Sequence, residues 1–297
     1  MAIKRYTITD FRRDYPNDDA CLDKIFQLRY SNLICPNQKC ESDNKFTKVC
    51  NRRSYQCPSC GLQIYPTKGT IFEKTTTPLT YWFYAIYLQT TTRNGVAAKE
   101  LERQLDICYK TALRMAHQIK KLMANKTYEP LTGVIEMDET FIGGLNKNRH
   151  ADKKVEESQG RSCKDKTPVF GMIQRNGNVI AHVVENTNST TLKEKIDATI
   201  NKELSIIISD EWLGYSPLSK SDYKHVVVNH SEKEYVRGAF HTNTIEGVWS
   251  QLKRTIKGTH IHVSRKHLQK YVDEVAFRYM HKHKQDTMFE TILSHVV

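Results

Sequence analysis

The chain has 297 residues, and its 45 Lys and Arg exceed its 33 Asp and Glu by 12 positive charges, which gives a pI of about 9.2. This excess favours a polyanionic partner such as nucleic acid, although charge alone fits a merely soluble basic protein equally well. The sequence has no apolar run of about 18 residues, and charges interrupt the N-terminal segment where a signal peptide would be apolar. We therefore expect no membrane partner and an intracellular protein, in the cytoplasm or nucleoid of a bacterium or in the nucleus of a eukaryote.

Near the N-terminus, residues 20–33 carry apolar side chains at helical spacing, which predicts a short helix. Two cysteine pairs follow this helix, Cys35 with Cys40 and Cys57 with Cys60. Clustered cysteines in a reduced compartment indicate a metal site, and spacers of four and two residues suit the tight turns that bring four thiolates to one ion. The pattern predicts a zinc ribbon with one structural Zn²⁺.

The next segment is expected to be helical. Residues 77–92 are apolar and aromatic, and residues 96–106 and 110–125 form two amphipathic patterns joined by a short turn. This arrangement is typical of a helix-turn-helix, although an ordinary helical hairpin has the same pattern. The second helix would expose side chains suited to bases or phosphates, namely Lys110, Thr111, Arg114 and Gln118.

From residue 133 the pattern changes to strands. Within residues 133–144 the segment before Asp138 is apolar, which predicts a strand, and residues 169–185 form a hairpin whose turn is Asn176–Gly177. The intervening residues 145–167 are rich in Lys and Arg and have few large apolar side chains, which predicts an exposed, mobile basic loop.

A helix, two strands and two further helices complete the chain. The expected ranges are a helix over 189–202, a buried strand over 204–211, a short strand over 225–230, a helix over 241–258 that ends at Gly258, and a helix over 264–284. Hairpin, third strand, helix, strand and helix form the order of a ribonuclease-H-like domain, a mixed sheet flanked by helices. The predicted fold class is therefore an α+β or α/β multidomain protein, with a zinc ribbon and helix-turn-helix followed by this sheet.

Three acidic residues occupy matching positions in these elements. Asp138 is expected to end the first strand, Asp210 to end the buried strand, and Glu246 to lie early on a later helix. Three crowded carboxylates repel one another unless a hard cation is bound, so the set predicts two Mg²⁺ or Mn²⁺ ions for phosphodiester chemistry. Lys253 follows Glu246 by two helical turns and can hold a substrate phosphate beside the metals.

Neighbouring polar residues leave alternatives open. Asn243, one turn before Glu246, is a possible ligand or helper, but its side chain also suits helix capping. His241 is a second possible accessory residue, and with His230, His260 and His262 it can contact phosphate, although a structural role is favoured for each histidine alone.

Several sequence segments resemble those of a known protein family. Among them are MDETFIGG, IISDEWLGY, HTNTIEGVWSQLKR and the cysteine segment before them. From about residue 20 to about residue 285 the chain resembles the Merlin-type DDE transposases and their bacterial insertion-sequence relatives. The resemblance implies a ribonuclease-H-like catalytic domain, a metal triad of Asp138, Asp210 and Glu246, and transposition with recognition of terminal inverted repeats.

The resulting prediction is a transposase that binds the double-stranded ends of a mobile element, cuts DNA and transfers the strands to target DNA. A homodimer or higher oligomer is expected, because two ends must be joined together. The expected domains are residues 1–70 for the helix and ribbon, 71–130 for the helix-turn-helix, and 131–297 for catalysis. The alternatives are a domesticated DNA-binding regulator with a silent active site, against which the acids and Lys253 argue, and a metal-dependent nuclease without strand transfer.

Overall fold

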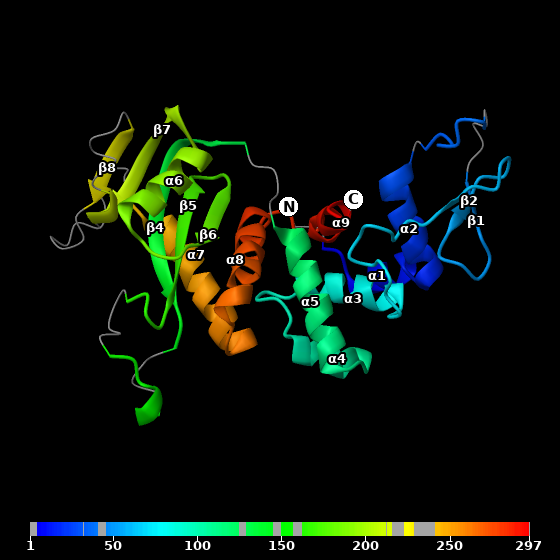
Figure 1. The fold of residues 1–297 in the computed structure, drawn as a ribbon, viewed down its shortest axis with the longest axis horizontal. Coiled ribbons are helices and arrows are strands. Elements are labelled where there is room, and N and C mark those ends of the chain that lie inside the picture. The colour runs from blue at the N-terminus through cyan, green and yellow to red at the C-terminus, as the bar shows by residue number, and fades with distance from the viewer. Residues whose placement is uncertain are drawn as a thin grey trace. The chain divides into compact units, whose positions relative to one another are not determined.

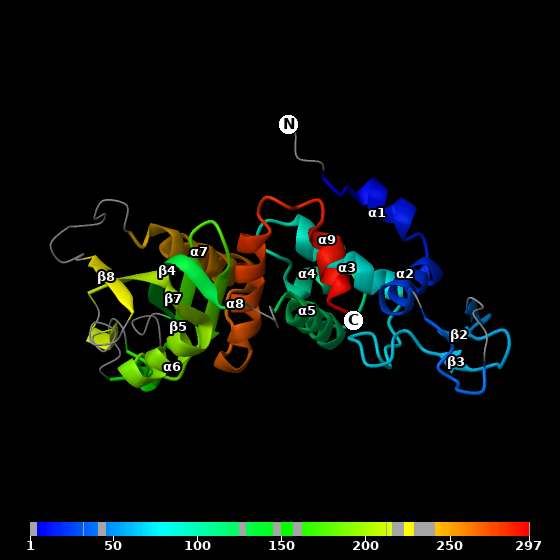
Figure 2. The same cartoon turned by 90° about the horizontal axis from the view of Figure 1, so that it is seen from above.

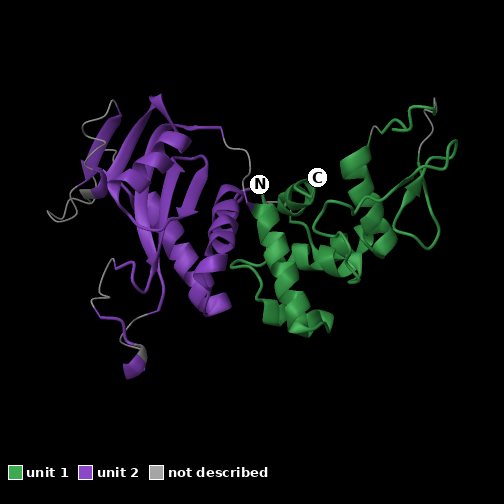
Figure 3. Cartoon of the chain, viewed as in Figure 1, with its two compact units in different colours: residues 1–123, 284–297 green, residues 124–283 purple. Residues whose placement is uncertain are grey.

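The protein divides into two compact units, one formed by residues 1–123 with 284–297 and the other by residues 124–283 (Figure 3). The sequence analysis assigned residues 284–297 to the catalytic domain, whereas they pack within the first unit. No helix in the described part of the chain is long and apolar enough to cross a membrane. The structure is a computed structural model that describes residues 5–31, 33–40, 46–124, 129–144, 150–156, 162–211, 213–215, 223–228 and 241–296.

The first unit combines a small antiparallel sheet with helices (Figure 1). Its elements are α1 (Ile8–Asp14), α2 (Asp18–Tyr30), β1 (Thr47–Lys48), β2 (Tyr55–Gln56), β3 (Gln63–Ile64), α3 (Leu79–Thr91), α4 (Ala98–Leu105), α5 (Tyr109–Met123) and α9 (Met288–Ser294). The strands pair in the order β1, β2, β3. Helix α2 lies beside this sheet, where Phe26 stacks on Tyr55 with ring centres 3.9 Å apart. The helix and the cysteine segment therefore form one packed module.

Aromatic side chains form the core of the helical part of this unit. Phe11 of α1, Phe83 of α3 and Phe289 of α9 are buried, and the ring centre of Phe289 lies 6.1 Å from that of Phe11 and 6.3 Å from that of Phe83. The Nδ1 atom of His295 lies 2.6 Å from the carbonyl oxygen of Leu122 in α5. Burial of these aromatic rings holds the C-terminal helix in the first unit.

The second unit contains a five-stranded mixed sheet with strand order β6-β5-β4-β7-β8. Its elements are β4 (Leu131–Ile142), β5 (Thr167–Gln174), β6 (Val179–Val183), α6 (Ser189–Thr199), β7 (Ile200–Asp210), β8 (Lys224–Val228), α7 (Asn243–Arg254) and α8 (Arg265–Met280). Strands β4, β5 and β6 are antiparallel neighbours, whereas β7 runs parallel to both β4 and β8. The mixed sheet flanked by helices confirms the predicted fold class.

The two faces of this sheet are covered by different helices. Helix α6 covers one face, and α7 and α8 cover the other (Figure 2). Because side chains alternate along a strand, Ile135 and Met137 of β4 belong to the core on the α6 face. Ile142 belongs to the core on the α7 face, together with Trp249 and Leu252 of α7. The even-numbered residues of β4 therefore point toward α7.

The predicted bounds needed three corrections. Strand β4 does not end at Asp138, because β5 pairs with it as far as Ile142. The helix over 241–258 does not end at Gly258: α7 passes into a π-helical segment (Thr255–His260), where buried Ile256 keeps the turn packed. Strand β7 begins at Ile200, inside the range expected to be helical.

The structure describes part of the predicted basic loop over residues 145–167. Residues 145–149 and 157–161 lie outside the described residues. The described remainder includes a short 3-10 helix (Ala151–Lys153), and its last residue, Thr167, already begins β5.

Candidate metal centre and active site

The four predicted cysteines come together in the first unit. The sulfur atoms of Cys35 and Cys60 are 3.5 Å apart, those of Cys40 and Cys57 are 3.8 Å apart, and all four lie within 4.8 Å of one another. Four thiolates bound tetrahedrally to Zn²⁺ at the usual bond length of about 2.3 Å lie about 3.8 Å apart. The cluster therefore has the dimensions of a tetrahedral zinc site.

Backbone hydrogen bonds shape the two turns that carry these cysteines. Cys40 N donates to the carbonyl oxygen of Asn37 over 2.8 Å, and Cys57 N donates to that of Leu62 over 2.9 Å. Gly61 has φ +78°, a left-handed conformation that glycine adopts without strain. The backbone N–H of Leu62 is the main cause that lowers the pKa of the Cys60 thiol to about 6.

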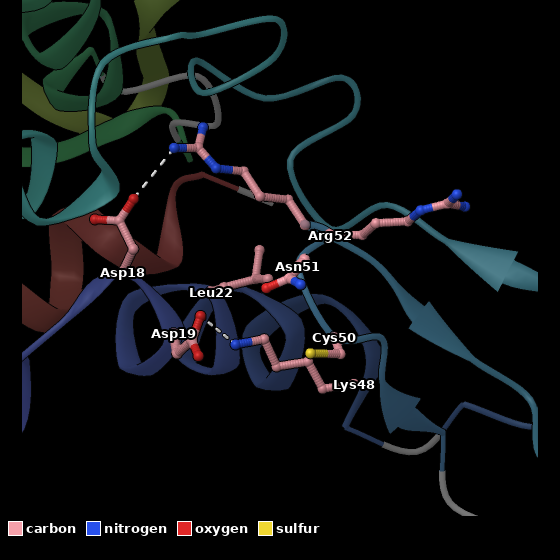
Figure 4. Close-up of a pocket in the computed structure, with 8 residues that line it drawn as sticks. Asp18, Asp19, Leu22, Lys48, Cys50, Asn51 and Arg52 are labelled. Atoms are coloured by element: carbon pink, nitrogen blue, oxygen red, sulfur yellow. Dashed lines mark hydrogen bonds and ion pairs between the residues drawn. The ribbon is translucent and has the colours of Figure 1, made fainter.

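A pocket of about 360 Å³ lies between α2 and the chain around β1 and β2 (Figure 4). Its lining residues are Asp18, Asp19, Leu22, Lys48, Cys50, Asn51, Arg52 and Arg53. Arg53 pairs with Asp18 over 3.1 Å, and Lys48 pairs with Asp19, while the Arg52 side chain points away. Because its charges are largely paired, and none of the predicted site residues lines it, this pocket is not the candidate site.

The acids of the second unit lie on the α7 face of the sheet. The parallel register pairs Glu136 of β4 with Ile208 of β7, and Asp138 and Asp210 each follow two residues later. Both carboxylates are therefore carried by neighbouring strands and point to the same face. Glu139 points to the opposite face, toward the core around Met137.

Glu246 lies in the first turn of α7, as predicted, and is exposed. It accepts a hydrogen bond from the hydroxyl of Thr242 over 3.2 Å. Lys253 is also exposed, seven residues further along the same helix, which corresponds to about 10 Å along its axis. Glu246 and Lys253 are thus both exposed on one helix, two turns apart.

The electrostatics of Asp138 reflect the other acids. Burial is the largest cause that raises the pKa of Asp138 to about 8, and the charges of Glu139, Asp210 and Glu246 raise it further. Within the described residues, Asp138, Asp210 and Glu246 do not approach one another as closely as the four cysteines do, all within 4.8 Å.

Trp249 of α7 connects this helix to the first acid. Its Nε1–H donates a hydrogen bond to Oδ2 of Asp138 over 3.0 Å. Gly171 of β5, the register partner of Asp138, lies beneath the indole, and a Cβ added there would be 2.4 Å from Trp249 Cη2. Because Gly171 has no side chain, the Trp249 indole can lie close enough to the strand to reach Asp138.

Glu136 forms a second connection between β4 and α7, which the sequence analysis missed. Its carboxylate accepts hydrogen bonds from the backbone N–H groups of Thr244 and Ile245 and from the side chain of Arg175. The Nδ1 atom of His241 lies 3.5 Å from Glu136 Oε1, so this predicted accessory residue lies beside Glu136, just before α7. The sequence signal was the spacing of Glu136 and Asp138, which puts both on one face of a strand.

The remaining polar residues have separate surroundings. Asn243 is exposed and begins α7, and the side chain that caps this helix is the carboxylate of Glu136, not the amide of Asn243. His260 packs against the ring of Tyr271, with ring centres 4.7 Å apart, while His262 is exposed. His230 lies outside the described residues.

Helices α4 and α5 form the predicted helical pair, joined at Asp106 with φ +51°. On α5, Lys110 and Arg114 are exposed and Thr111 and Gln118 are partly exposed. Three of these four residues follow one another at intervals of four, so the set forms one stripe along the helix.

The strand order and the acids on one face define the class of the second unit, the ribonuclease-H-like fold. The family model of the ISXO2-like transposase domain matches residues 130–280, just over half of the chain. The chain therefore belongs to the ISXO2-like transposase family, which confirms the resemblance found in the sequence.

A relative and a solved structure extend this comparison. The chain is 28% identical over 284 residues to an uncharacterized protein in the transposable element ISH50 of Halobacterium salinarum, with 91% of this chain and 95% of that protein covered. It also matches the crystal structure of the Mos1 strand transfer complex at 11% identity, over 72% of this chain and 78% of that chain. The TM-score of this match is 0.25.

Proposed function

We propose that this protein binds the double-stranded terminal inverted repeats of a mobile element, cleaves them and joins them to target DNA. The observation that carries the proposal is the placement of Asp138 and Asp210 on neighbouring parallel strands under α7, whose first turn holds Glu246. Membership of a transposase family and the relative from a transposable element support the same reaction.

Two divalent cations, Mg²⁺ or Mn²⁺, are the cofactors that suit this set of carboxylates. Asp138, Asp210 and Glu246 would hold them, and the bound ions would activate an attacking water or 3′-hydroxyl and stabilise the leaving oxygen. The protein itself orients Asp138 through Trp249 and offers Lys253 to a substrate phosphate. One further ion, Zn²⁺, would be structural and held by the four cysteines.

The first unit is the proposed binding unit for element ends. The ribbon over 1–70 and the helical pair over 71–130 would contact the duplex, with the α5 stripe of Lys110, Thr111, Arg114 and Gln118 facing the groove. The excess of 12 positive charges in the chain supports a phosphate-rich partner. A dimer or higher oligomer would hold two ends together.

The test is incubation of the purified full chain with labelled element ends and a target plasmid, with Mg²⁺ or Mn²⁺ and with EDTA as control. Joined products that require the divalent ion support the proposal. Cleavage without joining of a pre-cut end supports a nuclease instead, and binding without either reaction supports a regulator with a silent site. End binding should fall steeply with salt, because it releases counterions from several phosphates.

The third acid is tested by a matched pair of variants on one helical turn. Glu246→Gln should lower joining at least about a thousandfold while end binding stays intact, because a neutral amide is a weak ligand for a hard cation. Asn243→Ala should keep measurable activity. Joining rates under single turnover measure both, and an active Glu246→Gln beside an inactive Asn243→Ala would show that the third ligand is Asn243.

A further inference from the structure

The proposed chemistry makes no use of Glu136, yet its side chain is fully buried in the catalytic unit. Its Oε2 atom accepts hydrogen bonds from Thr244 N over 2.9 Å and from Ile245 N over 3.2 Å. Its Oε1 atom accepts a hydrogen bond from the hydroxyl of Thr244 over 2.7 Å. The carboxylate thus caps a helix whose first bonded residue, Thr244, lies 108 residues later in the chain.

The charge of Glu136 is matched from two sides. Arg175 Nε donates to Oε1 over 2.9 Å, and the same guanidinium donates through Nη2 to the carbonyl oxygen of His241 over 3.2 Å. The first turn of α7 adds the positive end of the helix dipole. Arg175 therefore ties the chain just before α7 to the same carboxylate that holds the first turn.

Glu246 lies between two anchors of α7. Thr244 and Ile245 are bound to Glu136 on one side of it in the sequence, and Trp249 is bound to Asp138 on the other. Both anchors end on β4, on residues two positions apart. Rotation or sliding of α7 along β4 would break both anchors at once.

We propose that Glu136 is a positioning residue that sets the distance between Asp138 and Glu246, and thereby the affinity of the second unit for its divalent cations. Glu246 is exposed and depends on its helix for its position. Because Glu136 and Asp138 share one strand, the capped helix start is held at a fixed distance from the first acid. This inference rests on the proposed function.

The variant Glu136→Gln keeps the shape of the side chain and removes its charge. An amide places a donor where Arg175 or the first-turn N–H groups already donate, so at least one of these contacts is lost. Glu274→Gln is the matched control, since Glu274 is also fully buried and accepts from Arg278 over 3.1 Å, but within α8. Both variants remove one buried charge from the same unit.

Two readouts separate positioning from general stability. Hydrogen exchange followed by mass spectrometry reports the opening of residues 243–254 in the metal-free protein. Titration of the zinc-loaded full chain with Mn²⁺, followed by the loss of the free-ion paramagnetic resonance signal, reports cation affinity without any reaction. The Mn²⁺ concentration that gives half the maximal rate of joining is measured in parallel.

The expected result is specific to Glu136→Gln. Exchange in residues 243–254 should accelerate at least about tenfold, and half-saturation with Mn²⁺ should need about ten times more ion, as is usual when a support of a metal ligand is removed. The affinity for element ends should stay within about twofold. Glu274→Gln should leave both the exchange of α7 and the Mn²⁺ dependence unchanged.

The variants Asp138→Asn and Glu246→Gln distinguish a failure of the positioning role of Glu136 from a failure of the proposed metal site. If both of these variants lose Mn²⁺ binding while Glu136→Gln binds as the wild type does, the positioning role is overturned and the metal set stands. If both keep Mn²⁺ binding, the metal set fails and the positioning role fails with it.

A second pair keeps the test decisive if Glu136→Gln does not fold. Thr244→Val removes the hydroxyl that donates to Glu136, and Thr244→Ser keeps it. Thr244→Val should raise the half-saturating Mn²⁺ concentration about threefold, and Thr244→Ser should not. Equal Mn²⁺ binding by the two variants would overturn the proposal.

Discussion

Helices α3 and α7 belong to different units but begin in the same way. In α3, Asp18 accepts hydrogen bonds from the backbone N–H and the hydroxyl of Thr80, both over 2.9 Å, and pairs with Arg53. In α7, Glu136 accepts the same two kinds of hydrogen bond from Thr244, and Arg175 pairs with it. Each helix start is capped by a carboxylate from a distant element, and an arginine donates a hydrogen bond to that carboxylate.

The two caps differ in burial and in what the helix carries. The Asp18 side chain is 35% exposed, whereas that of Glu136 is fully buried. Helix α3 is packed along its length, with Leu79, Trp82 and Phe83 fully buried, so packing also holds it in place. Helix α7 is packed on one side and exposes an acid on the other. The same device therefore adds stability in the first unit and sets the geometry of a site in the second.

The largest effect should come from the metal centre of the first unit. Cys57→Ser should abolish zinc binding and end binding, because a bound structural zinc contributes on the order of 10 kcal/mol to folding. The unfolding transition of the second unit should stay unchanged. Zinc content, end binding and calorimetry measure these effects, and Cys50→Ser, outside the cluster, is the control. Zinc content equal to that of the wild type in Cys57→Ser would contradict the assignment.

The next effect concerns the underside of α7. Gly171→Ala should lower the free energy of unfolding of the second unit by about 2 to 3 kcal/mol, because the new methyl group must displace the Trp249 indole. Gly247→Ala makes the same chemical change on α7 itself, where nothing lies within 4 Å, and should raise stability by about 0.5 to 1 kcal/mol. Denaturant unfolding measures both. Equal changes in the free energy of unfolding would show that the stability of α7 does not depend on the close packing of Trp249 on Gly171.

A smaller effect is expected at the cap of α3. Asp18→Asn should lower the free energy of unfolding of the first unit by about 1 kcal/mol, the usual cost of a lost helix cap, and end binding at low temperature should persist. Asp19→Asn is the neighbouring control, because the side chain of Asp19 is 71% exposed and its pairing with Lys48 should contribute less than about 0.5 kcal/mol. A large loss of end binding in folded Asp18→Asn would give this cap a functional role like that of Glu136.

Local sequence patterns predicted most of the helices and strands, but few of the contacts between them. The spacing of apolar residues predicted α2, α3, α4, α5 and α8, and the spacing of Cys35, Cys40, Cys57 and Cys60 predicted a cluster that the structure brings together. The two caps depend on contacts between residues 62 and 108 positions apart, which no local periodicity reveals. The end of β4 was placed too early for the same reason, because pairing with β5 extends the strand to Ile142.

A third carboxylate, Asp273 of α8, contrasts with both caps because the side chain that donates to it, Gln269, is neutral. Gln269 Nε2 donates to Asp273 Oδ1 over 2.7 Å and to the carbonyl oxygen of Ala181 over 2.9 Å, and Gln269 Oε1 accepts from Val183 N over 2.7 Å. Gln269 thus pairs with the backbone of the edge strand β6, and Asp273 supports it. Burial raises the pKa of Asp273 to about 6, against the lowering effect of Gln269.

The last predicted effect follows from the sign of this shift. Because the folded protein binds the Asp273 proton more tightly than the unfolded chain does, this group stabilises the fold less as pH rises from about 4 through about 6. Asp273→Asn should therefore raise the free energy of unfolding at pH 7.5 by about 1 kcal/mol, after allowance for partial exposure, and by less at pH 5. Denaturant unfolding of both proteins at the two pH values measures the difference, from which other titrating groups cancel. If Asp273→Asn is destabilising at both pH values, the carboxylate is needed to hold Gln269, and an arginine is not required to keep a buried acid charged in this fold.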